Sequence, residues 1–86
     1  MNNFIASIRV VLKPTVSDPQ GATIMAGLKT LGFNSIQDLR AGKFLEVRIK
    51  AKDLDSAKNQ VTDMCIRLLA NPVIENYDFD IEALTN

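Results

Sequence analysis

The most constraining feature of this chain of 86 residues is the order in which two hydrophobic spacings follow one another. Apolar and polar residues alternate in three segments, at about 3–13, 43–52 and 76–82, and this period of two predicts half-buried β-strands. Residues 19–31 and 54–70 instead carry apolar side chains three and four residues apart, which is the spacing of an amphipathic helix. The sequence therefore predicts a series of strands with a helix inserted at two points.

Both helices have sequence signals at their ends. Asp18 and Pro19 predict an N-cap and a first helical residue, because an acidic cap accepts free backbone N–H groups and proline has none to satisfy. Gly32 is placed to end this helix. Asp53 caps the second helix, which must stop just before Pro72. The stripes predicted to face the core are Ile24, Leu28 and Leu31 in the first helix, and Leu54, Ala57, Val61, Met64, Cys65 and Leu68 in the second.

A fourth, less regular strand is predicted at 35–40, with a hairpin turn at Ala41 and Gly42 leading into the next strand. The complete order is then β-α-β-β-α-β. With right-handed crossovers this order predicts an α+β two-layer sandwich of the ferredoxin-like, split βαβ kind, with two helices on one face of a four-stranded antiparallel sheet. No linker divides the chain, so we expect a single domain over residues 1–86.

The sheet face without helices is predicted to mix apolar and charged side chains. The last strand should lie beside the first, which would bring Asp78 and Asp80 near Arg9. Apolar residues among such charges suggest a face partly covered by another chain, although a solvated face with scattered apolar residues is the alternative. The candidate self-association face consists of Ile5, Arg9, Val11, Phe44, Arg48 and Asp80.

Composition narrows the chemistry that this chain can perform. It has no histidine, so the commonest general base and metal ligand is missing. The lone Cys65 lies on an apolar helix stripe and is expected to be a buried thiol. We therefore predict no catalytic, cofactor-binding or metal-ligating residue of its own, and we leave open whether the chain counts as an enzyme.

Charge and hydropathy exclude further classes. The net charge is zero, which argues against a general nucleic-acid binder. Residues 1–52 hold eight Lys/Arg against three Asp/Glu, and residues 53–86 hold two against seven, so the two halves should attract each other within or between copies. We expect no membrane span and no signal peptide, and a single cysteine fits a cytoplasmic protein.

Three polar loop elements are the candidate partner contacts. One is the start of the first helix, where free N–H groups can bind anions, although Asp18 already supplies a negative cap. The second is a basic turn that would also fit plain solvation, and the third is a corner that would also fit a simple helix stop. The residues are Asp18, Gln20 and Gly21, then Arg40, Gly42 and Lys43, and finally Asn71 and Pro72.

Three blocks of residues resemble a known family. They are Asp18-Pro19-Gln20-Gly21, then Gly42-Lys43-Phe44-Leu45-Glu46, and the long run from Cys65 to Tyr77 that contains Leu-Leu-Ala-Asn-Pro-Val-Ile-Glu. In order and spacing they are similar to the PurS subunit of phosphoribosylformylglycinamidine synthase, over nearly the whole chain. Ser17 departs from the family, which often has leucine at this position.

The resemblance implies a non-catalytic assembly subunit of a ligase complex in purine biosynthesis. In this family the small subunit joins a glutaminase subunit, which releases ammonia from glutamine, and a synthetase subunit, which uses ATP and magnesium to form the amidine. The small subunit itself is expected to bind no cofactor. Family members form dimers that can pair into tetramers, which agrees with the candidate self-association face.

A small-molecule regulatory domain of the ACT type is the alternative function. It shares the β-α-β-β-α-β order and binds amino acids near the first strand–helix junction, where Asp18 and Gly21 lie. An acylphosphatase-like enzyme would need an arginine in the loop 14–18, which has none. An RNA-recognition domain would need stacking aromatics, for which Phe44 is the single candidate, beside an acidic last strand.

Overall fold

The structure, a computed structural model, describes residues 1–84. Three long strands form an antiparallel sheet in the order β2-β1-β3, with β1 in the centre. One helix follows β1, and a second helix, extended by a π-helical turn, follows β2. The elements are β1 (Asn2–Leu12), α1 (Pro19–Thr30), β2 (Gly42–Ala51), α2 (Leu54–Met64), η1 (Cys65–Leu69) and β3 (Glu75–Ala83).

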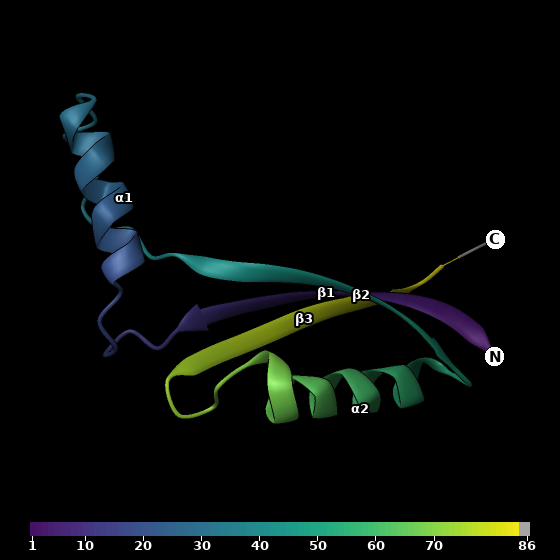
Figure 1. The fold of residues 1–86 in the computed structure, drawn as a ribbon. Helices are drawn as coiled ribbons and strands as arrows, with labels where there is room; N and C mark the ends of the chain where they lie inside the picture. The colour runs from purple at the N-terminus through teal and green to yellow at the C-terminus, as the bar shows by residue number, and fades with distance from the viewer. Residues whose placement is uncertain (85–86) are drawn as a thin grey trace.

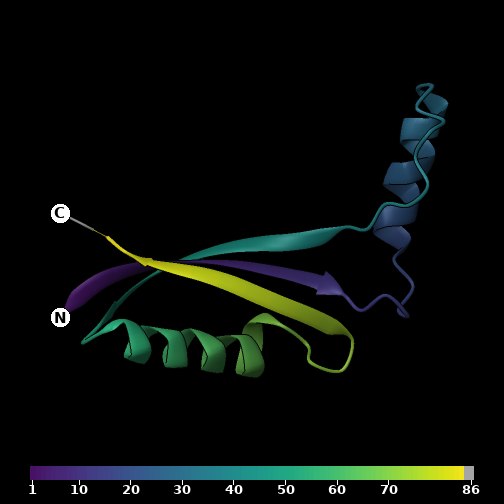
Figure 2. The same ribbon diagram turned by 180° about the vertical axis from the view of Figure 1, so that it is seen from behind.

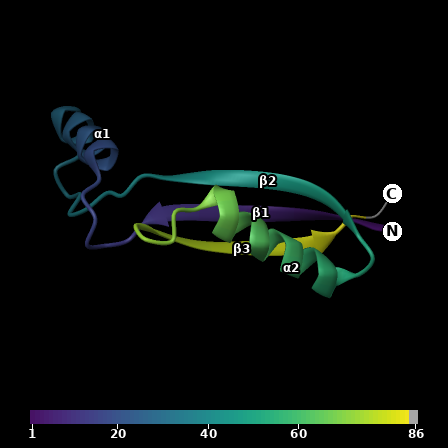
Figure 3. The same cartoon turned by 60° about the horizontal axis from the view of Figure 1, so that its bottom comes forward.

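The core lies between the sheet and α2, which covers one face (Figures 1 and 3). Because side chains of a strand point alternately to its two faces, every second residue of β1 faces α2. These residues are buried together with Ala57, Val61 and Cys65 of the helical layer, and half-buried side chains of β2 and β3 surround them. The fully or almost fully buried members of β1 are Phe4, Ala6, Ile8 and Val10.

The predicted four-stranded sheet is wrong, although the general α+β, two-layer arrangement is consistent with the structure. The sheet has three strands, because residues 35–40 form no strand. They run back alongside α1 instead (Figures 1 and 2). Ile36 and Leu39 are half-buried, and their spacing of three suits packing beside a helix better than a place in a sheet. The predicted turn at Ala41 and Gly42 is likewise absent, since β2 simply begins at Gly42.

Helix α1 does not cover the sheet as predicted. It stands away from the sheet, on the side opposite α2 (Figures 1 and 2). Met25 and Leu28 are half-buried, whereas Ile24 and Leu31 of the predicted core stripe are exposed. We call residues 13–41, which leave the sheet and return to it, the arm, and the remaining described residues the body.

The ends of the helices match their sequence signals. Asp18 caps α1 with Pro19 as its first residue, and Asp53 caps α2 by accepting from the backbone N–H of Ser56 at 2.8 Å. Gly32 follows α1 with a φ of 99°, a left-handed conformation that glycine adopts without strain. The second helical segment ends at Leu69, ahead of the proline.

The π-helical turn corrects one core prediction. Its hydrogen bonds span five residues, as in the bond from the Ala70 N–H to the Cys65 carbonyl at 2.9 Å. The turn therefore shifts the helical phase by about one residue. Leu69 packs against the core, and Leu68, predicted to be buried, is 82% exposed.

Candidate functional site

The base of the arm is held by the carboxylate of Asp18. Its Oδ1 accepts the backbone N–H of Gly21 at 3.0 Å, and its Oδ2 accepts the backbone N–H of Ala41 at 2.7 Å. The Asp18 side chain thereby links the start of α1, which follows β1, to the segment that leads back into β2. These hydrogen bonds, from Gly21 and then Ala41, lower the pKa of Asp18, because they stabilise its charged form.

Glycine at position 21 is required by the same contact. A Cβ there would overlap the Asp18 carboxylate and lie 2.8 Å from the Leu39 carbonyl oxygen. The helix can thus approach the returning segment closely only if residue 21 has no side chain. Gly21 is accordingly buried.

Arg40 reinforces the base from the other side. Its Nη2 donates to the backbone carbonyls of Lys13 at 3.0 Å and Val16 at 2.7 Å. The guanidinium therefore ties the end of the arm to its beginning. Asp18 and Arg40, both candidate partner contacts, are engaged within the chain by these bonds.

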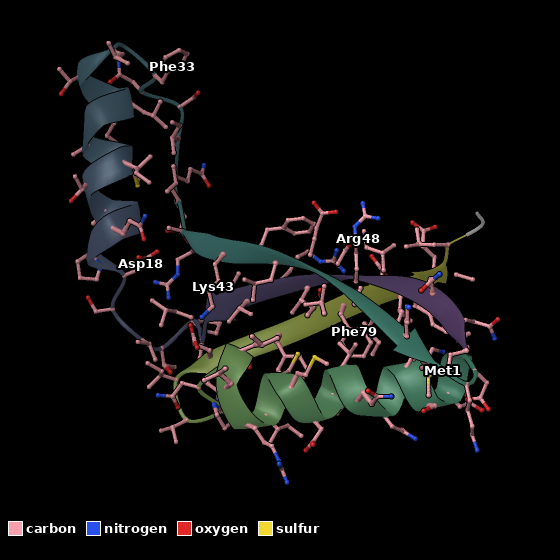
Figure 4. All side chains as sticks on the ribbon, turned by 45° about the vertical axis from the view of Figure 1, so that its right-hand side comes forward. Met1, Asp18, Phe33, Lys43, Arg48 and Phe79 are labelled. Atoms are coloured by element: carbon pink, nitrogen blue, oxygen red, sulfur yellow. The ribbon has the colours of Figure 1, made fainter. Side chains whose placement is uncertain are left out.

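Several candidate partner residues gather around one shallow pocket beside the base of the arm. Its volume is about 210 Å³, and its lining includes Asp18, Gln20, Gly42, Lys43 and Glu75. Asp18 lies at the foot of α1, and Lys43 lies at the start of β2 (Figure 4). Gln20 and Lys43 are exposed. Arg40 lines a neighbouring pocket with Val11 and Asn76 instead.

Asn71 and Pro72 belong to a tight turn between η1 and β3. The Asn71 backbone N–H donates to Oε1 of Glu75 at 2.6 Å, and its side-chain Oδ1 accepts the Val73 N–H at 3.1 Å. The Lys13 N–H donates to the Ile74 carbonyl at 2.8 Å, so this turn adjoins the start of the arm. The sequence pattern did not indicate that Glu75 accepts this bond from Asn71. A carboxylate four residues after Asn71, in a turn that contains proline, is the sequence signal for such a bond.

The open sheet face carries the ion pairs that the strand order predicted. Arg9 Nε lies 2.6 Å from Oδ1 of Asp78, and its Nη2 lies 3.0 Å from Oδ2 of Asp80. Hydrogen bonds to Asp80 and Asp78 raise the pKa of Arg9. Asp78 and Asp80 are largely exposed to solvent and Arg9 is about half exposed, so these pairs contribute little to stability. Val11 and Phe44 on the same face are exposed, and Ile5 is half-buried.

Groups suited to chemistry are scarce in the described part of the chain. Residues 1–84 contain no cluster of three or more acidic or cysteine side chains that could hold a metal ion. Cys65 is a buried free thiol, and burial raises its pKa, which keeps it in the unreactive protonated form. In the same range, no helix has the length and apolar character needed to cross a membrane.

Comparison with known proteins identifies the family. The sequence model described as PurS, phosphoribosylformylglycinamidine (FGAM) synthase, matches residues 5–83. The chain belongs to the PurS family. Among its relatives, the PurS subunit of phosphoribosylformylglycinamidine synthase from Synechocystis is 42% identical over 83 residues, covering 96% of this chain and 83% of the relative. The Bacillus subtilis subunit is 41% identical over 79 residues, covering 92% and 93%.

Solved PurS structures share the fold. Methanocaldococcus jannaschii PurS superposes with a TM-score of 0.83 at 34% identity, covering 95% of this chain and 99% of that one. A chain in the structure of PurLQS from Thermotoga maritima gives 0.84 at 32% identity, covering 98% and 100%. The arm is about a third of the chain, so scores this high require the arm to superpose as well. The projecting arm is therefore a feature that this chain shares with other PurS structures.

Proposed function

We propose that this chain is a non-catalytic assembly subunit of phosphoribosylformylglycinamidine synthase in purine biosynthesis. The observation that carries the proposal is the PurS family match over residues 5–83. A Methanocaldococcus jannaschii relative is described as one of the subunits of formylglycinamide ribonucleotide amidotransferase in the purine biosynthetic pathway. The similarity to a chain of the Thermotoga maritima PurLQS structure supports a place beside two further subunits.

The PurS resemblance implies the division of labour in this complex, and the side chains of this subunit agree with it. Its glutaminase partner releases ammonia from glutamine, and its synthetase partner consumes ATP, with magnesium, to form the amidine. The chain lacks histidine, and its one thiol is buried, so it is poorly equipped for proton transfer or nucleophilic attack. Its contribution is to hold the two partners in a productive complex. We place this complex in the cytoplasm, which a single unpaired cysteine supports.

The pocket beside the base of the arm is our proposed docking point, together with the adjoining Asn71-Pro72 turn. Lys43 and Gln20 are exposed there, whereas Asp18 and Arg40 already bond to the backbone. We therefore assign partner contact to Lys43 and Gln20, and positioning of the arm to Asp18 and Arg40. Polar groups on loops held by rigid neighbours are well suited to recognition.

The ACT-type alternative is less well supported. Such a domain would bind an amino acid at the start of α1, but there the Asp18 carboxylate occupies the free N–H of Gly21. A second carboxylate at this helix end would meet the charge of the first. The PurS match over nearly the whole chain also favours the assembly subunit.

The proposal is tested by mixing the purified chain with its glutaminase and synthetase subunits and measuring the mass of the product. A complex that contains all three subunits is expected with ATP, magnesium and glutamine present. Lys43→Ala should weaken this complex without unfolding the chain, since exposed substitutions usually change stability by less than about 0.5 kcal/mol. Lys58→Ala, on the outside of α2, is the matched control. Formation of the same complex from the two large subunits alone, with this chain left unbound, would refute the proposal.

A further inference from the structure

The outer edge of β3 is an unpaired strand edge. In the sheet order β2-β1-β3, the described residues give β3 a neighbouring strand on one side only. Just after β3, Leu84 donates its N–H to the Asn3 carbonyl at 2.8 Å, and just before it, Ile74 accepts the Lys13 N–H at 2.8 Å. Alternate residues of an antiparallel pair form such bonds, so the even-numbered residues of β3 direct their backbone groups to β1. The residues in the middle of the strand that direct theirs to the free edge are Tyr77, Phe79 and Ile81.

Within residues 1–84, these edge groups have no hydrogen-bond partner. The bonds that loops and side chains make to the backbone lie elsewhere, at the helix caps, in the arm and in the turn before β3. A row of free N–H and C=O groups is a template on which another extended segment can pair. The side chains of the three edge residues are half-buried against the core, which keeps the strand extended. The edge is therefore preformed for strand addition.

The open face beside this edge carries an acidic row, which we define as Asp78, Asp80 and Glu82. Arg9 binds Oδ1 of Asp78 and Oδ2 of Asp80, so the second oxygen of each exposed carboxylate can accept from another donor. Glu82 forms no ion pair within the described residues. One arginine thus balances three carboxylates, and the row keeps a negative charge. Basic side chains on the same face of an added strand would be attracted to it, because opposite charges on neighbouring strands stabilise a sheet.

The other face of an added strand would lie beside α2. The helix crosses the sheet obliquely, and its first turns lie on the β3 side (Figure 3). Ala57 and Ile81 belong to one apolar cluster, so the start of α2 lies near the end of β3. Leu54 shares the helical stripe of Ala57 and Val61, yet it is 41% exposed, whereas the other two are buried. An apolar side chain of an added strand would cover Leu54.

We propose that the outer edge of β3 receives an extended segment of another protein, with apolar residues at every second position and lysine or arginine between them. The segment would exchange backbone hydrogen bonds with Tyr77, Phe79 and Ile81. Its basic side chains would meet the acidic row, and its apolar side chains would lie beside α2. The inference goes beyond the assembly function, because it specifies the conformation and the charge of one bound segment.

A second copy of this chain does not fit the edge. Two β3 strands paired antiparallel would set their acidic rows opposite each other, and like charges across a pair are destabilising. Pairing of β3 with the basic strand β2 of another copy would be a head-to-tail contact, which repeats from copy to copy unless the rotation closes a ring. The charge and the geometry therefore favour a basic strand from a different protein.

The test uses a synthetic peptide of seven residues in which lysine and valine alternate, and a matched peptide in which glutamate replaces lysine. Hydrogen exchange of the full chain is followed by NMR with each peptide. The lysine peptide should slow exchange of the Tyr77, Phe79 and Ile81 amides at least about tenfold, because pairing protects them, and the glutamate peptide should not. Unchanged exchange, or protection of the Phe44 amide on β2 instead, would overturn the proposal. So would edge amides that are already protected in the chain alone, since another copy would then occupy the edge.

A pair of exposed glutamates on the open face gives matched variants. Glu82→Lys, on β3, should raise the dissociation constant of the lysine peptide about threefold to tenfold, because an attractive pair across the strands becomes repulsive. Glu46→Lys makes the same change of net charge on β2, away from the edge, and should leave the constant nearly unchanged. Equal weakening by both variants would show that the peptide responds to net charge alone, which contradicts strand addition at β3. The three-subunit mixture tests the assembly function separately.

Discussion

The body and the arm of this chain are stabilised in different ways. In the body, three strands and α2 bury a shared apolar core that includes Ile8 and Val61. In the arm, a single helix leaves most of its apolar stripe exposed, and its geometry depends on a few polar bonds at its base. Burial gives the body its stability, because the hydrophobic effect grows with the area removed from water. The arm has little such area, so it is suited to contact with other chains.

The largest expected difference between the two regions concerns apolar truncation. Ile8→Ala, in the centre of the sheet, should lower the free energy of unfolding by about 2–5 kcal/mol. Leu31→Ala, on the exposed side of the arm, should lower it by less than about 0.5 kcal/mol. Urea unfolding at low protein concentration, where self-association contributes little, measures both. Similar losses would mean that the arm packs against its own body after all.

The two glycines of α1 sharpen the comparison within the arm itself. Gly21→Ala should destabilise the chain by about 1–3 kcal/mol, because its Cβ would overlap the Asp18 carboxylate and approach the Leu39 carbonyl. Gly27→Ala has open space around it and should stabilise the helix by about 0.5–1 kcal/mol. The same unfolding experiment compares them. An equal effect of both substitutions would remove the evidence for a tightly held base.

The smallest expected effect is a pH dependence of the arm. The pKa of Asp18 is lowered in the folded chain, which means that folding stabilises the charged carboxylate relative to its protonated form. Its contribution is therefore present above the unfolded pKa, at about 3.9, and is lost as the pH falls through the folded value. The stability difference between wild type and Asp18→Ala should shrink over this window. Hydrogen exchange of the α1 amides should accelerate in the variant, and a difference that stays constant with pH would exclude the charge as the cause.

The body was predictable from sequence because its signals are local and repeated. The alternation in the strands, the cap Asp53 and the proline after the second helix all gave elements within a residue or two of those observed. The pairing of Arg9 with Asp78 and Asp80 followed from the strand order alone. The buried positions of Val61 and Cys65 followed from helical spacing.

The arm was mispredicted because spacing specifies which face of a helix is apolar but not what covers it. Ile24 and Leu31 have the spacing of core residues, yet the structure leaves them exposed. Leu68 was assigned to the core for the same reason, and one π-helical turn removes it. At the candidate site, the sequence suggested that Arg40 is a free cation. Its bonds to the Lys13 and Val16 carbonyls could not be predicted, because they join residues that are far apart in the sequence. The single domain over residues 1–86 stays a prediction.

The most direct test of the assembly function compares two nitrogen sources for the reconstituted synthase. The glutaminase and synthetase subunits are supplied with ATP, magnesium and either glutamine or ammonia, with and without this chain, and amidine formation is measured. If the chain couples its partners without performing chemistry itself, as we propose, its omission should abolish synthesis from glutamine and spare much of the synthesis from ammonia. Full glutamine-dependent activity without the chain would contradict its role as an assembly subunit.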